Sequence, residues 1–138
     1  MKITSMIASL SLLALAACGG GDAGAGAKSP TPNPRPSSTA TISILQPAPG
    51  QVVEGTTLMV KVKIDGATVL EQASRDVRPD TGHVHLALDG ETVTLLAGLE
   101  FELKDLKPGQ HLLEASFAAA DHGPFNPPVV TTTTFTVT

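Results

Sequence analysis

The chain contains four histidines, and imidazole both binds transition metals and titrates near neutral pH. They are His83, His85, His111 and His122. His83 and His85 are two positions apart, so on a β-strand both side chains emerge on the same face. Because the alternate positions 84, 86 and 88 are all apolar, we expect the two histidines to form a pair on the solvent side.

The elements that position these histidines are predicted to be β-strands. Apolar residues alternate with period two, which marks strands with one buried face, and this pattern occurs seven times. The runs are 42–44, 58–64, 84–88, 92–96, 99–103, 111–117 and 129–138. Turn signals such as Asp89-Gly90 and Pro108-Gly109 separate neighbouring runs. No helical pattern of useful length competes, so we predict an all-β domain of two packed antiparallel sheets in Greek-key order.

The order of these segments resembles that of bacterial Ig-like and fibronectin type III-like modules. The resemblance covers Thr41 to Thr138 and rests on the segments ISILQPAPGQVVEGTTLMVKVKI, HVHLALDG, LKPGQHLLEA and TTTTFTVT. It implies a seven-stranded Ig-like β-sandwich. The chain lacks Trp, a disulfide pair and a corner Tyr, so kinship with antibody domains is not implied. His111 follows the corner at Pro108, and we interpret it as a structural residue that bonds the backbone.

In an Ig-like topology the strand that begins at His83 starts where the strand after the proline corner ends. His122 and Asp121 should therefore lie close to His83 and His85, whereas His111 should lie at the opposite end of the sandwich. Two imidazoles with a third imidazole or a carboxylate satisfy Zn(II) or Cu(II). One hypothesis is thus a periplasmic or surface Zn/Cu-binding protein with His83, His85, His122 and Asp121 as ligands.

The rival hypothesis is a binding or accessory module that needs no cofactor. The loop from Asp65 to Gly82, with Asp76, Arg78 and Asp80, and the loop from Asp121 to Pro128 would form one recognition end, because loops on a rigid sandwich often carry binding. An envelope protein or a glycan is the expected partner. The alternative is that both loops are surface insertions without a role.

Catalysis is not expected. The serines and threonines lack a nucleophile motif, and the paired acids Asp76 and Asp80 lie in a loop with no pocket implied. We therefore predict that the protein is not an enzyme. A metal-dependent hydrolase would require the histidines to hold an ion with an open coordination position.

The N-terminus is typical of an export signal. Lys2 makes the start positive, and the apolar run from Ile7 to Ala17 is shorter than the ~20 residues of a membrane-spanning helix. The run ends in Leu15-Ala16-Ala17-Cys18, which resembles the lipobox of bacterial lipoproteins. That resemblance implies a signal peptide over residues 1–17 and acylation of Cys18, palmitate included, as the membrane anchor. Simple cleavage that releases a soluble protein is the alternative.

Position 19 is Gly rather than Asp, so the inner-membrane retention signal known for lipoproteins is absent. The resemblance therefore favours the outer membrane of a double-membraned bacterium. With Cys18 lipidated, the folded part has no thiol left for a disulfide.

Composition separates a linker from the domain. Residues 18–40 are rich in Gly, Ser and Pro and contain hardly any large apolar side chain, so they are predicted to be a flexible linker that precedes a domain over residues 41–138. The net charge of −4, the lack of a Lys/Arg cluster and the few aromatics argue against nucleic-acid binding.

Overall fold

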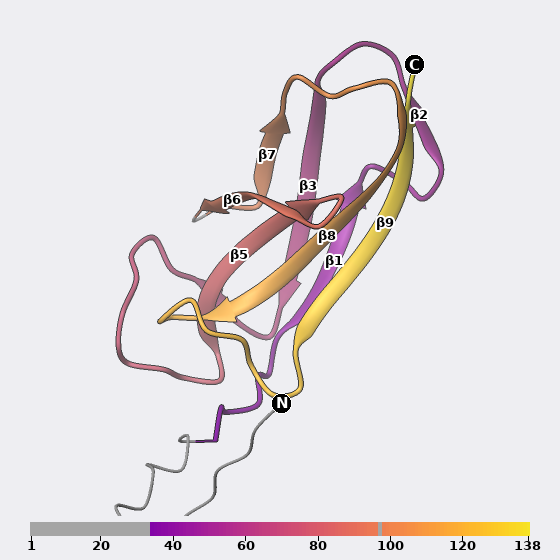
Figure 1. Cartoon of the computed structure of the whole chain (residues 1–138). Coiled ribbons are helices and arrows are strands. Elements are labelled where there is room, and N and C mark those ends of the chain that lie inside the picture. The colour runs from indigo at the N-terminus through magenta and orange to yellow at the C-terminus, as the bar shows by residue number, and fades with distance from the viewer. Residues whose placement is uncertain (1–33, 97) are drawn as a thin grey trace, which may run out of the picture. The chain divides into compact units, whose positions relative to one another are not determined.

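Alternating buried and exposed residues build two β-sheets that pack against each other (Figure 1). The computed structural model describes residues 34–96 and 98–138, so Cys18 and the predicted signal peptide lie outside the described residues. The strands are β1 (Thr41–Gln46), β2 (Gln51–Val53), β3 (Leu58–Asp65), β4 (Thr68–Val69), β5 (Thr81–Leu88), β6 (Glu91–Leu96), β7 (Glu100–Leu103), β8 (Gly109–Ala119) and β9 (Val129–Val137). Within the described ranges, no helix is long and apolar enough to cross a membrane.

One sheet has three strands in the order β1-β3-β7, and the other has six, in the order β2-β9-β8-β5-β4 with β6 also paired to β5. All seven predicted strands are present, and the predicted all-β, Ig-like sandwich is confirmed. The described part contains nine strands rather than seven, because β2 and β4 are also strands. Both pair in parallel, β2 with β9 and β4 with β5. They are only three and two residues long, too short to show alternation.

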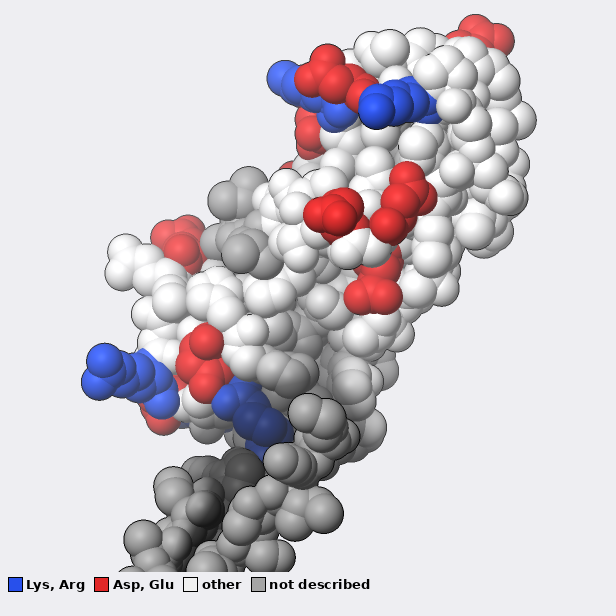
Figure 2. Space-filling model, viewed as in Figure 1, with Lys and Arg blue, Asp and Glu red and all other residues white. Residues whose placement is uncertain are grey.

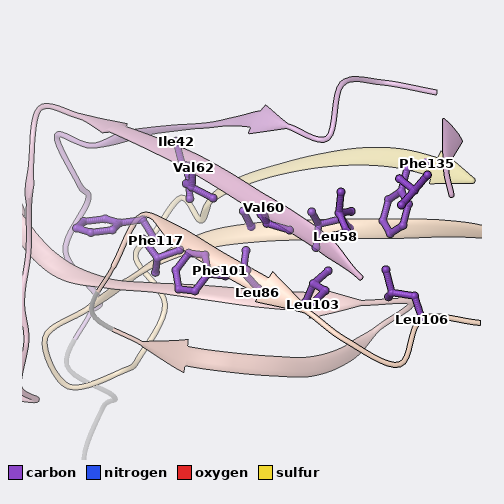
Figure 3. Packing of buried hydrophobic residues seen from close by; sticks show 14 of the residues in the cluster. Ile42, Leu58, Val60, Val62, Leu86, Phe101, Leu103, Leu106, Phe117 and Phe135 are labelled. Atoms are coloured by element: carbon purple, nitrogen blue, oxygen red, sulfur yellow. The ribbon is translucent and has the colours of Figure 1, made fainter. Parts of the chain in front are cut away.

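The core lies between the two sheets and is filled mainly by aliphatic and phenylalanine side chains (Figure 3). Val60 of β3 and Leu86 of β5 are fully buried and come from opposite sheets. All four phenylalanines of the chain are at most 7% exposed; they are Phe101, Phe117, Phe125 and Phe135. Because all four phenylalanine rings are packed in the core, none of them is available on the outer surface.

Strand register brings the start of β5 next to the end of β8. His83 pairs with Ala118 and His85 with Ser116, so the first part of β5 lies beside the loop that follows β8. The prediction that these two strand ends meet is confirmed.

Residues 34–40 belong to the same compact unit as the sandwich, although the sequence assigned them to the linker. The Thr39 amide donates to the Pro79 carbonyl at 3.0 Å, and the Asn126 amide donates to the Pro36 carbonyl at 2.9 Å. The chain therefore enters the domain at the end that carries the long 66–80 loop and the loop after β8. This is the end at which the histidines were expected.

Candidate functional site

Three of the four histidines meet at the end where the chain enters the sandwich. The His122 ring lies 4.3 Å from the His83 ring and 5.3 Å from the His85 ring between centroids, with interplanar angles of 13° and 19°. His85 Nε2 and His122 Nδ1 are 3.0 Å apart. We call His83, His85 and His122 the histidine stack.

His83 corrects the expected picture of an exposed pair. It does project from the same face of β5 as His85, but it is only 2% exposed, whereas His85 is half-buried. The loop after β8 folds back over this face and places His122 on top of His83. The ring of His83 also bonds through Nε2 to the Ala120 carbonyl at 3.3 Å. A carbonyl only accepts, so Nε2 of His83 carries the hydrogen.

The position of His122 depends on a tight turn. The His122 amide donates to the Ala119 carbonyl at 2.8 Å, and the Ala119 amide donates to the Gly123 carbonyl at 2.9 Å. His122 itself has a φ of 62°, in the left-handed region that residues other than glycine adopt at a cost. The turn thus holds an unfavourable backbone conformation at the residue that completes the stack.

The environment of the stack favours neutral imidazole at His85. Burial lowers the pKa of His85, and the neighbouring rings of His122 and His83 lower it further by charge repulsion. Neutral imidazole is the form that binds metal ions and accepts hydrogen bonds.

Asp121 does not join the histidines, contrary to its predicted place among the metal ligands. Its two carboxylate oxygens accept from Nη1 and Nη2 of Arg35 at 2.7 and 2.8 Å, and Oδ1 also accepts from the Gly123 amide at 3.0 Å. The hydrogen bonds from Arg35 hold the pKa of Asp121 well below its usual range. The carboxylate is therefore engaged as the partner of a cation.

Arg35 connects the segment before the first strand to the histidine loop. Besides its bidentate pair with Asp121, its Nε donates to the Pro124 carbonyl at 2.7 Å. A side chain at Gly123 would overlap the guanidinium, so the loop passes directly against it. This role could not be predicted from the sequence, because Arg35 lies in a segment with the composition of a linker.

Phe125 anchors the same loop from inside the domain. Its ring is 2% exposed and packs on Phe117 with centroids 5.8 Å apart and nearly parallel planes. The signal that could have identified it is a lone Phe between prolines in an otherwise polar loop. Arg35 and Phe125 together fix the backbone on both sides of His122.

A groove of about 290 Å³ runs beside the stack on the outer face of the six-stranded sheet. Its lining includes the polar residues His85, His122, Glu114 and Ser116 and the apolar residues Pro124 and Val130. Register places His85, Ser116 and Val130 in one row across β5, β8 and β9. The groove thus combines hydrogen-bonding groups at one edge with apolar surface at the other.

The predicted binding residues of the long loop lie apart from this groove. Arg78 and Asp80 pair with each other, with Nε and Oδ1 3.2 Å apart, and this raises the pKa of Arg78 and lowers that of Asp80. Asp76 lines a separate hollow together with Arg35 and Asp121. The two loops do meet at one end, but the loop residues singled out from the sequence do not line the groove.

Across the described residues, no group of three or more His, Cys, Asp or Glu side chains converges on one metal position. On the face shown in Figure 2, basic groups lie next to acidic ones near the top and at the lower left of the view, whereas the middle carries acidic groups alone.

His111 lies at the far end of β8, as predicted. Its Nε2 is 2.7 Å from the Lys107 carbonyl and its Nδ1 is 2.7 Å from Asp89 Oδ2. The hydrogen bond to the Lys107 carbonyl raises the pKa of His111, and the hydrogen bond to the Asp89 carboxylate raises it further. Conversely, the hydrogen bond from the Leu112 amide lowers the pKa of Asp89, and the hydrogen bond with His111 lowers it further. These bonds join the β5–β6 hairpin turn to the corner before β8.

Known proteins provide similarity in fold only. No family model matches the chain, and no curated protein matches it. Among solved structures, the fibronectin(III)-like modules of Clostridium thermocellum CbhA give a TM-score of 0.46 at 16% identity, over 70% of this chain and 96% of that one. The PKD domain from human KIAA0319 gives 0.44 at 11% identity, over 85% and 91%. An engineered protein gives 0.47 at 14% identity over 72% of this chain, which spans about a fifth of that protein.

Proposed function

We propose that this protein is an exported lipoprotein, anchored through Cys18, whose Ig-like domain binds an envelope protein in the groove beside the histidine stack. The observation that carries the binding role is the groove itself, in which one row of residues runs from His85 on β5 through Ser116 on β8 to the apolar Val130 on β9. Such a mixture of apolar surface with a few placed polar groups is typical of ligand sites.

A protein partner fits this groove better than a glycan does. Glycan recognition commonly uses exposed aromatic rings, but all four phenylalanines are buried and the chain has neither Trp nor Tyr. The apolar side of the groove instead suits aliphatic side chains of an extended segment. His85 and His122 can exchange hydrogen bonds with the backbone of that segment.

The anchoring part of the proposal is tested by replacing the acylated residue. In cells fed labelled palmitate, the unaltered chain should acquire label and sediment with membranes. Cys18→Ser should lose the label and should not sediment as the mature, processed form. Unchanged labelling and sedimentation of Cys18→Ser would contradict lipid anchoring.

The groove is tested by matched surface substitutions. Val130 lines the groove and is 45% exposed, whereas Met59 lies on the other sheet and is 40% exposed. With the full chain as bait in envelope extracts, Val130→Asp should reduce recovery of a specific partner at least about tenfold, since a charge in an apolar contact is unfavourable. Met59→Asp should leave recovery unchanged. Equal recovery with both variants would contradict the groove as the binding surface.

A second candidate function is binding of Zn(II) or Cu(II) at the same end, as an alternative to protein binding. The specific observation in its favour is the meeting of three imidazoles, two of which have ring nitrogens 3.0 Å apart.

A further inference from the structure

Building on the metal-binding candidate for this end of the sandwich, we propose that His85 Nε2 and His122 Nδ1 are the two protein ligands of a Cu(II) site. Water completes the coordination from the open side of the groove. This assignment differs from the four-ligand set expected from sequence, because it excludes both His83 and Asp121.

The distance between the two nitrogens fits chelation of one ion. Two ligands that are each about 2.0–2.1 Å from a metal, at square-planar or tetrahedral angles, are about 2.8–3.4 Å apart. His85 Nε2 and His122 Nδ1 are 3.0 Å apart, so a modest rotation of the two rings would direct both nitrogens at one ion. A metal ion takes the place of the hydrogen that they share, and this hydrogen moves to the other nitrogen of the donor ring.

His83 supports the site without joining it. Its ring lies parallel to that of His122 with centroids 4.3 Å apart, so the two rings stack face to face. Its Nε2 is occupied by the Ala120 carbonyl, and no metal-holding group of three that would include its Nδ1 exists among the described residues. His83 is therefore a positioning residue that sets the orientation of the His122 ring.

Asp121 is excluded for a different reason. Each of its oxygens accepts a hydrogen bond from the guanidinium of Arg35. A metal ion would have to displace that cation to reach the carboxylate. The pair instead holds the turn at His122, so Arg35 and Asp121 act as positioning residues as well.

Two imidazoles favour Cu(II) over Zn(II). Zinc sites generally use three or four protein ligands, whereas among the described residues no group of three or more His, Cys, Asp or Glu side chains is placed to hold one ion. Cu(II) binds a given nitrogen site most tightly among the divalent first-row metals and accepts tetragonal geometry.

The test is a metal titration of the full chain carrying Cys18→Ser, so that no thiol competes. Calorimetry with Cu(II) should give one ion per chain, with Zn(II) bound at least about tenfold more weakly. Pulsed EPR should count two coordinated imidazoles in the protein without further substitutions. Absence of Cu(II) binding, or a count of three imidazoles, would overturn the assignment.

Variants then identify the ligands. His85→Ala and His122→Ala should each weaken Cu(II) binding at least about 100-fold, because loss of supporting residues already costs 10–100-fold. His83→Phe keeps a ring in the stack and should change affinity less than about tenfold. His111→Gln, at the opposite end, should have no effect. Binding that persists in His85→Ala would show that the ion is adventitious, and loss in His83→Phe equal to that in His122→Ala would make His83 a ligand.

This outcome can be separated from that of the protein-binding proposal. Val130→Asp should reduce partner recovery at least about tenfold, but the bound Cu(II) should still show two coordinated imidazoles, because position 130 supplies neither of them. Failure of copper binding with intact partner recovery would overturn only the copper site. Failure of partner recovery with intact copper binding would overturn only the protein-binding role. Thermal melting of each variant confirms that it is folded before its binding is compared.

Discussion

Phe125 is predicted to be the residue on which the histidine loop depends most. It is 2% exposed, and its ring stacks on Phe117 with centroids 5.8 Å apart. Replacing a buried Phe with Ala generally costs about 3–5 kcal/mol of unfolding free energy, of which the ring pair accounts for about 0.5–1.5 kcal/mol. Because the loop is at the surface and can partly collapse into the space, we expect the lower end, about 3 kcal/mol.

Urea unfolding at 25 °C, followed by circular dichroism, measures this loss. Phe125→Leu keeps most of the apolar volume and should cost less than about 1.5 kcal/mol. Val130→Ala is the exposed control and should change stability by no more than about 0.5 kcal/mol. A loss below about 1 kcal/mol for Phe125→Ala would refute the reasoning, since it would mean that the loop is not packed into the core.

Three further predictions concern single positions. Gly82→Ala places a methyl group into a carbonyl of β8 and should cost at least about 2 kcal/mol in urea unfolding, whereas Gly98→Ala meets no atom and should be neutral. The raised pKa of His111 stabilises the fold at pH values below the ordinary His pKa, and this contribution is lost as pH rises through the folded pKa. His111→Gln should therefore flatten the fall in Tm from about pH 6 to pH 9. Thr133→Val removes a buried hydroxyl that has no hydrogen-bond partner and should raise stability by about 1 kcal/mol in the same unfolding assay. A pH-independent Tm difference for His111→Gln, or destabilisation by Thr133→Val, would contradict these assignments.

The sandwich could be predicted because each long strand has one buried face. In β3, Leu58, Val60 and Val62 are buried while Met59 and Lys63 are exposed, so the period-two pattern is visible in the residues themselves. β4 was missed because two residues cannot establish a period. Its pairing with β5 is a tertiary event that follows from the path of the long loop.

The meeting of the histidines was predictable, but their surroundings were not. Strand periodicity predicts that His83 and His85 share one face of a strand, and the Ig-like strand order predicts that His122 lies close to them. Burial of His83 depends on a loop that folds back over the sheet, and nothing in the alternation encodes that path. The partner of Asp121 was missed for a related reason, since Arg35 is 86 residues away in a proline-rich segment.

The most direct test of the account is photo-cross-linking from the groove in living cells. A photoreactive residue at Val130 should give a discrete adduct with an envelope protein, because this position lines the groove beside the histidine stack. The same residue at Met59, on the other sheet and similarly exposed, should give none. An adduct from Met59 but not from Val130, or equal adducts from both, would contradict the groove as the functional surface.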